Sequence, residues 1–584
     1  MTAEGLETKL FPELYCYISY SMLSPNVKPS FSYLTKELQK FDLIEAILIL
    51  SKLNLLMSEE KYAIDKNFQY RLYDLFLNNY YKNKFIYFIK REGRKDKFFL
   101  FHRHQLLFLL KNVFLICNRV PNFSFQNRKE RERLGKCCLL TNDFLTIFKD
   151  RKSSGNGNLE KIKENLWKEL LPSYEINLIP DLMFDIGRMR IIFNKIIHQL
   201  NKDNLFVDIN KKFEEITRFS INEYMFLVFA VIALCFQRRK EIIDNPNAIV
   251  IDENSFTRNS VISSGQIVNL LNFISLPLKQ FKDVIYSSRD LEYNYGFLPF
   301  KKYPLARISE NKYIPLDINF ILEKISNGIF WIINDGLPRE ERSQFHTFWG
   351  KLFETYFIYL FKEVGLLQKG LFISKPCFDG TNHEVADGIL NHGEDLILFE
   401  CKFTILTQES RYSSSTEELI KEIRTKFERN KSGEWKGYGQ LANSIIKLFS
   451  SGNKWMCRYI DKKKVKRVFP VLVTYENILN APFTNYFLNK YFQTLLNNSS
   501  FENKVDIKPL IIISIGDLEA SQPFFNNFPR LLEERLRFDP ELDVSFSDFL
   551  KRKYRDNNLL SPKLIKDEYE QFFIEIRKAI FGKS

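Results

Sequence analysis

Histidine and paired cysteine are scarce in this sequence. Its 584 residues include 6 histidines and 8 cysteines, and the cysteines, which form no CxxC pair, stand at positions 16, 117, 137, 138, 235, 377, 401 and 457. No cysteine–histidine group has the spacing of a zinc site, which argues against a structural zinc ion. Isolated thiols are typical of a reducing compartment. We therefore predict a cytoplasmic protein.

Targeting segments and nucleotide-binding loops are also missing. The start, MTAEGLETKLFPELYCY, lacks the basic end and apolar stretch of a signal peptide. The most apolar segment, YMFLVFAVIALCF at 224–236, is short for a membrane span and predicts a buried helix. No GxxxxGK[ST] loop and no GxSxG turn occurs, which argues against an ATPase motor and a serine hydrolase. We expect no membrane partner.

The chain is long and basic. Its length predicts two to four domains, since single hydrophobic cores stop growing well below this size. A net charge of +14 favours an anionic partner. Nucleic acid is the first candidate for that partner, and an anionic membrane surface is the second.

Three segments differ in their apolar patterning. Residues 1–150 have helical spacing, as in FDLIEAILILSKLNLLM, and the polar stretch DRKSSGNGN at 150–158 predicts a linker. Residues 151–290 form a second helical block. From 291 to 584, helices alternate with strand candidates, which favours an α/β or α+β domain with a C-terminal helical extension. Short strands are expected around the SENK turn at 309–312, and the longer strand candidates are 371–374, 396–403, 468–475 and 509–515.

Charged residues interrupt one of these apolar strands. Glu400 and Lys402 in LILFECKF are two residues apart, so they lie on one face of the strand. Buried charges cost free energy unless they are paired or hold a metal. Asp387 lies just upstream, Glu354 sits on an aromatic-rich helix where it needs a partner, and Gln440 begins an amphipathic helix after a glycine-rich turn. These residues are candidates for a site.

Two carboxylates on neighbouring strands suit one kind of chemistry. Their oxygens can hold Mg²⁺ while water and substrate take its other positions. Such an ion polarises a phosphodiester and lowers the pKa of a bound water. A lysine on the same face can orient that water or neutralise the charge that builds on the phosphate. The pattern therefore favours phosphodiester hydrolysis.

The ordered set Glu354, Asp387, Glu400, Lys402 and Gln440 resembles the PD-(D/E)XK nuclease superfamily. The resemblance covers about 340–475 and implies a restriction-endonuclease-like core, with a central mixed sheet flanked by helices. It implies that Asp387, Glu400 and Glu354 are ligands of Mg²⁺, with Mn²⁺ as a substitute, and that Lys402 is the catalytic lysine. Gln440 resembles the glutamine of RecB-type members. The resemblance further implies a DNA endonuclease, in the manner of prokaryotic defence effectors against phage or foreign DNA.

The chain departs from the family pattern, and other interpretations stay open. Ala386 precedes Asp387 where proline is common, Ser444 replaces the RecB-type aromatic residue, and Glu384 competes with Glu354 as the additional acid. E-x-K also occurs elsewhere in the chain, for example at Glu310 and Lys312. The whole stretch could instead be a hairpin with a surface ion pair. Alternatives for the function are an inactive nuclease fold that binds nucleic acid, an RNA nuclease and an interaction scaffold.

Basic residues near this region are candidates for phosphate contacts. They are Lys426 and Arg429 in one segment, and Lys462, Lys463 and Lys464 in DKKKVKR. A solvated surface explains both groups about as well. The N-terminal helical region is expected to recognise substrate, sense a trigger, or bind a partner protein or a second copy of the chain.

Overall fold

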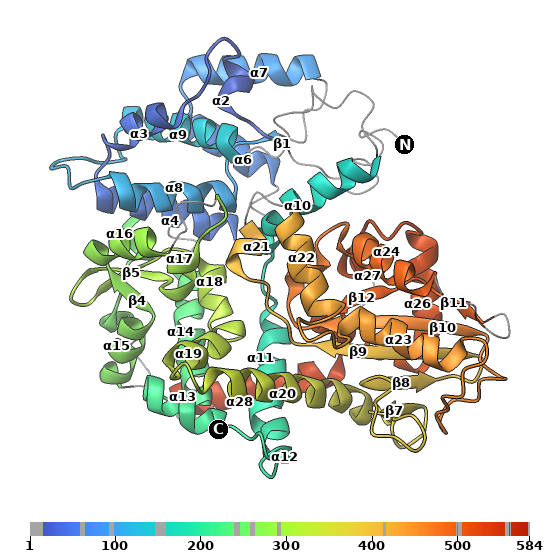
Figure 1. Cartoon of the computed structure of the whole chain (residues 1–584). Coiled ribbons are helices and arrows are strands. Elements are labelled where there is room, and N and C mark those ends of the chain that lie inside the picture. Colours follow the sequence, from blue (N-terminus) through green and yellow to red (C-terminus); the bar gives the residue numbers. More distant parts are fainter. Residues whose placement is uncertain are drawn as a thin grey trace.

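A computed structural model of the chain gives its fold (Figure 1). It describes residues 16–58, 65–92, 98–145, 159–238, 246–256, 263–288, 294–412, 416–497, 499, 501, 505–554, 560 and 562–581. The linker predicted at 150–158 lies outside the described residues.

The first part of the chain is helical, as its apolar spacing predicts. Its helices are α2 (Tyr20–Leu23), α3 (Phe31–Leu38), α4 (Leu43–Met57), α6 (Lys66–Phe76), α7 (Asn79–Glu92), α8 (Arg103–Ile116) and α9 (Arg128–Leu145). A short parallel pair, β1 (Cys16–Tyr17) and β2 (Phe98–Phe99), accompanies them. Asp42 starts α4 by accepting the backbone N–H groups of Ile44 and Glu45. Helix α4 is buried over most of its length and packs against α8.

A second helical block follows, and it carries a small sheet. Its helices are α10 (Leu159–Asn177), α11 (Leu182–Ile191), the π-helical turn η2 (Ile192–Ile196), α12 (Ile197–Gln199), α13 (Ile209–Thr217), α14 (Ile221–Arg238), α15 (Ser264–Phe273), α16 (Leu278–Ser287), α17 (Leu298–Lys302), α18 (Ile318–Glu323) and α19 (Asn327–Gly336). The strands β3 (Ile251–Asp252), β4 (Ser275–Pro277), β5 (Leu305–Ser309) and β6 (Lys312–Pro315) have the order β3-β6-β5-β4. The antiparallel pair β5–β6 confirms the strands predicted around 309–312.

Helix α14 contains the most apolar segment of the chain. Among the described residues it is the one helix long and apolar enough to cross a membrane, and half of it is buried. Tyr224 on α14 packs edge-on against Phe213 and Phe273. Core helices pass the same test of length and composition, so this is weak evidence for a membrane span. The packing favours the predicted buried helix.

The last part of the chain is built on a mixed sheet with strand order β11-β10-β9-β8-β7, in which β12 also pairs with β10. The strands are β7 (Phe372–Ser374), β8 (Gly388–Asn391), β9 (Asp395–Lys402), β10 (Arg467–Thr474), β11 (Asp506–Ile507) and β12 (Ile511–Ser514). The helices are α20 (Arg342–Glu363), α21 (Gln408–Tyr412), α22 (Thr416–Phe427), α23 (Gly437–Phe449), α24 (Thr484–Leu496), α25 (Ile515–Ala520), α26 (Phe528–Phe538), α27 (Phe546–Tyr554) and α28 (Lys563–Phe581). β9 and β10 are parallel, whereas β7, β8 and β9 are antiparallel neighbours. The four longer strand predictions are confirmed.

Helices cover both faces of this sheet, as an α/β domain requires. Phe399 points toward α20 and meets Phe357 and Phe361. Leu398 belongs to the opposite face and shares a core with Leu441 and other residues of α23 and α24. In Figure 1, α20 lies below β8 and β9, and α24 lies above the sheet. The strand β9 is therefore central and buried on both sides.

Buried contacts cross the boundary predicted at 290. On α10, the Trp167 indole stacks on Phe487 with ring centroids 4.7 Å apart and donates to Thr484 Oγ1 at 2.8 Å. On α11, Arg188 makes a bidentate ion pair with the fully buried Glu519, at 2.7 Å for each bond. The second helical block thus contributes to the core around the mixed sheet, and whether the three segments fold independently stays a prediction.

Candidate active site

The hairpin β8–β9 brings Asp387 beside Glu400. Its turn, NHGED, contains Gly393 at φ +78°, a conformation that favours glycine. The register pairs Gly388 with Phe399, so the residue before β8 lies next to Glu400 near the end of β9. Asp387 is fixed there because its Oδ2 accepts the backbone N–H of Cys401 at 2.7 Å. The hairpin that the sequence predicts thus juxtaposes the two carboxylates.

Glu400 is fully buried and lies next to a single cation. Lys402 Nζ is 2.6 Å from Glu400 Oε1, and the lysine side chain is 21% exposed. Among the described residues, Lys402 is the one cation paired with Glu400 Oε1, and Glu400 Oε2 has no hydrogen-bond donor. The alternative of a surface ion pair does not hold for Glu400, because its side chain is 0% exposed. A buried carboxylate oxygen without a donor, here Oε2, suits a bound cation.

The surroundings shift the protonation of these groups. Burial, followed by the charge of Asp387, raises the pKa of Glu400 to about 8. Burial likewise raises the pKa of Asp387 to about 6, against the opposing effect of Lys402. Burial disfavours the charged form of Lys402, but Glu400 and Asp387 outweigh it and raise the pKa of the ammonium. Two buried carboxyl groups share one lysine, and a divalent cation would favour the ionised form of both.

Glu354 has a partner that the sequence did not reveal. Lys375 Nζ lies 2.7 Å from Glu354 Oε2, and the backbone N–H of Lys375 donates to the Asp387 carbonyl at 3.0 Å. Lys375 has φ +45°, a left-handed conformation that is uncommon outside glycine. The charge of Glu354 reaches both Asp387 and Glu400. Glu384 is exposed, which favours Glu354 as the additional acid, and that role stays a prediction.

Gln440 is placed less directly. It lies in the first turn of α23, which packs against β9. Gly439 allows the helix to begin there, because a Cβ at this position would be 2.2 Å from the carbonyl oxygen of Glu428. Within the described part of the chain, no hydrogen bond joins the Gln440 side chain to Asp387 or Glu400. Its role stays a prediction.

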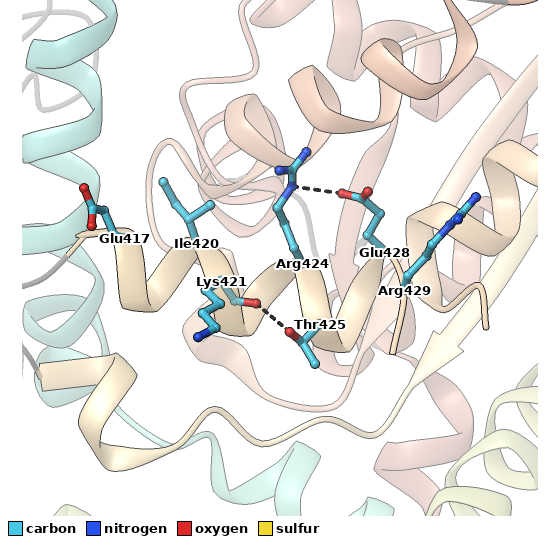
Figure 2. A pocket seen from close by; sticks show the side chains of 7 residues that line it. All are labelled: Glu417, Ile420, Lys421, Arg424, Thr425, Glu428 and Arg429. Atoms are coloured by element: carbon cyan, nitrogen blue, oxygen red, sulfur yellow. Dashed lines mark hydrogen bonds and ion pairs between the residues drawn. The ribbon is translucent and has the colours of Figure 1, made fainter. Parts of the chain in front are cut away.

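The basic residues predicted to bind phosphate lie in two places. Figure 2 shows the outer side of α22, where an open groove of about 470 Å³ is lined by Arg424 and Arg429 among others. Arg424 is paired with Glu428 at 3.0 Å. The Arg429 guanidinium lies 3.4 Å from the centre of the Trp435 ring. Lys426 is paired with Glu422 at 2.5 Å. The groove contains none of the predicted catalytic residues.

The second basic group lies at the other end of the sheet from the carboxylates. Lys462, Lys463 and Lys464 precede β10, whose first residue pairs with Asp395 at the start of β9. Glu400 lies five residues further along the strand, roughly 17 Å away at the usual rise per residue. Lys462 donates to the Trp455 carbonyl, and Lys464 lies 3.5 Å from Asp461. A phosphate next to the scissile bond is out of reach from this end of β9, so only a more distant phosphate contact stays predicted.

The site offers two carboxylates as ligands for a divalent ion. Within the described residues, no three His, Cys, Asp or Glu side chains are grouped tightly enough to hold a metal. Asp387 and Glu400 form a two-carboxylate set, and Glu400 Oε2 has no hydrogen-bond donor among the described residues. Mg²⁺ is commonly held by one or two carboxylates, with water and phosphate completing its coordination. The residues fit Mg²⁺ in that mode.

Comparison of the chain with protein-family models, with curated proteins and with solved structures found no match.

Proposed function

We propose that the protein is a Mg²⁺-dependent nuclease that hydrolyses phosphodiester bonds, with DNA as the first candidate substrate. The observation that carries the proposal is the arrangement on the β8–β9 hairpin: Asp387 beside a fully buried Glu400, with Lys402 on the same face. The resemblance to the PD-(D/E)XK superfamily supports the same chemistry. Defence against phage or foreign DNA is proposed on that resemblance alone.

Each site residue has a role in this proposal. Asp387 and Glu400 would hold the ion, which supplies a Lewis acid for a phosphodiester oxygen and acidifies a bound water. With Glu400 serving as a ligand, the Lys402 ammonium is available to orient the attacking water or to neutralise the phosphate. The water oxygen bonds to phosphorus and the bond to the 3′ oxygen breaks. One proton ends on that oxygen and the other is released, which leaves a 3′-hydroxyl and a 5′-phosphate.

Cleavage assays test the proposal directly. Purified protein is incubated with supercoiled plasmid, single-stranded DNA and RNA, in Mg²⁺ or Mn²⁺ and in EDTA. We expect metal-dependent cleavage that Asp387→Asn and Lys402→Ala each lower by about 100-fold or more. Lys312→Ala is the matched control, because it alters an E-x-K pair in the β5–β6 hairpin, and it should cleave like the wild type.

The same assays separate the alternatives. An RNA nuclease would cleave only RNA. An inactive fold would bind nucleic acid without any metal-dependent cleavage. A purely structural Glu400–Lys402 pair predicts that Lys402→Ala lowers the melting temperature and that Mn²⁺ does not bind, since breaking a buried ion pair is strongly destabilising. Absence of metal-dependent cleavage of all three substrates would overturn the proposal.

A further inference from the structure

Lys375 is a second lysine at the candidate site, and it lies outside the Asp387, Glu400 and Lys402 motif. It follows β7, and β7 pairs with β8 so that Ser374 opposes Gly388. Lys375 therefore lies beside Asp387, and its backbone N–H donates to the Asp387 carbonyl at 3.0 Å. Its position relative to the carboxylates is set by the sheet.

The two lysines serve different carboxylates and differ in exposure. Lys402 pairs with the fully buried Glu400, and its side chain is 21% exposed. Lys375 pairs with Glu354 at 2.7 Å, and these side chains are 36% and 26% exposed. Lys375 is thus the more exposed of the two lysines at the site. Although burial opposes it, the charge of Glu354 raises the pKa of Lys375, so the ammonium stays charged.

Folding does not account for this arrangement. A partly exposed ion pair adds little stability. A left-handed backbone at a residue other than glycine costs stability and is concentrated at functional sites. Lys375 combines both features, with φ +45°.

The charges of the site point to the ligand. When Glu400 is ionised as a ligand, a divalent ion and the two lysines carry four positive charges against the three of Asp387, Glu400 and Glu354, and the charge of the exposed Glu384 also reaches Lys375. An anion is then the favoured ligand, and Lys375 is the cation on its exposed side. We infer that Lys375 binds a phosphate of the nucleic acid next to the scissile one, and that Glu354 positions Lys375 for this contact and is not a metal ligand. This inference rests on the proposed function.

Binding measurements without turnover test the inference. The probes are a short fluorescein-labelled DNA duplex and a labelled RNA, with Ca²⁺ in place of Mg²⁺, and the readout is fluorescence anisotropy over a range of salt concentrations. Lys375→Met should raise the Kd roughly tenfold or more, because a charge-assisted contact is lost. It should also reduce the salt dependence by about one phosphate contact. Lys375→Arg should bind like the wild type.

Lys212→Met is the matched control. Lys212 is 34% exposed and pairs with Glu341 at 3.0 Å, on α13 and away from the mixed sheet. It should change neither the Kd nor the salt dependence. Glu354→Gln should weaken binding of the probe while leaving Mn²⁺ binding unchanged, whereas Asp387→Asn should weaken Mn²⁺ binding. Thermal melting of each variant shows whether it is folded.

The inference and the proposed function can fail separately. If the wild type cleaves and Asp387→Asn does not, but Lys375→Met keeps the wild-type Kd and salt dependence, the inference is overturned and the nuclease stands. If Glu354→Gln weakens Mn²⁺ binding as Asp387→Asn does, Glu354 is a ligand and the inference is overturned. Failure of the wild type to bind either probe overturns it too. Binding without any metal-dependent cleavage overturns the nuclease proposal instead.

Discussion

Glu400 is held in an apolar strand at an energetic cost. Its side chain is 0% exposed, and its one close cation is Lys402. Burial raises the pKa of Glu400 to about 8 from an ordinary value of 4.5. The folded protein therefore holds a proton at this carboxyl over a pH range in which the unfolded chain has released it. Stability and protonation are linked at this residue.

This linkage predicts how stability depends on pH in EDTA. A raised carboxyl pKa stabilises the fold fully below pH 4.5, and that stability is lost as pH rises through about 8. The shift predicts that the free energy of unfolding falls by about 2–4 kcal/mol between pH 5 and pH 9. Glu400→Gln cannot release a proton, so its stability should be much flatter over this range. Chemical denaturation at several pH values measures both curves.

Divalent metal should oppose this loss of stability with rising pH. Ligands must be deprotonated, so Mn²⁺ binding grows stronger as pH rises. The wild type in Mn²⁺ should therefore gain melting temperature relative to EDTA at pH 8, and Glu400→Gln should gain little. Parallel pH curves for the two proteins in EDTA would contradict the buried, protonated state of Glu400.

The site residues that could be predicted from the sequence are those that a local pattern specifies. Glu400, Lys402 and Asp387 were predictable, because two-residue periodicity and a glycine turn specify a hairpin and its facing side chains. Lys375 was not, because its relation to Glu354 depends on the β7–β8 register and on a left-handed backbone that no glycine signals. The functions of all these residues stay predictions.

Helices α11 and α28 are distant in sequence but approach each other closely. At Gly187 on α11, a Cβ would lie 2.7 Å from the backbone oxygen of Ile565 on α28 and 2.8 Å from its Cγ2. Arg190 on α11 adds two hydrogen bonds to Glu575, each 2.8 Å long. The backbone of α28 therefore requires glycine at this point of contact.

Gly187→Ala should consequently destabilise the protein. The added methyl group must push α28 away, which costs about 1–3 kcal/mol. Gly350→Ala on α20 is the matched control, since nothing lies within 4 Å of its Cβ position. It should raise stability by about 0.5–1 kcal/mol through the helix propensity of alanine. Urea denaturation followed by circular dichroism measures both. A Gly187→Ala variant as stable as Gly350→Ala would refute the close packing.

Strands and helices were predictable one by one, but their pairing was not. The segment 468–475 reads as an apolar strand from composition, and β10 lies there. Nothing local in it states that β10 runs parallel to β9, which places the lysines at 462–464 at the end of the sheet away from Glu400. Likewise, α28 reads as an amphipathic helix, while its contact with α11 spans more than 370 residues of chain. Long-range contacts of this kind decide which charges share a site.

The whole molecule is joined by helix α10, which begins where the predicted linker ends. Trp167 is 0% exposed in the core that also contains strands of the mixed sheet. Nearby, Lys163 pairs with Asp543 at 2.6 Å, and both side chains are buried. Glu175, at the other end of α10, accepts from Lys301 at 2.6 Å and from Arg411 at 3.0 Å. Helix α10 also packs against α8 of the first segment, so one helix contacts both neighbouring segments.

If α10 stabilises the mixed sheet, the Trp167→Ala substitution should destabilise the sheet as well as α10. Loss of the indole leaves a cavity beside Phe487 and an unpaired Thr484 hydroxyl, and should cost about 3–5 kcal/mol. Trp331→Ala is the control, because that side chain is 44% exposed and should cost less than about 1 kcal/mol. Hydrogen exchange with mass spectrometry should show reduced protection of β10 and α24 in Trp167→Ala. Full protection there, with loss confined to α10, would mean that the sheet domain folds independently of the helical block before it.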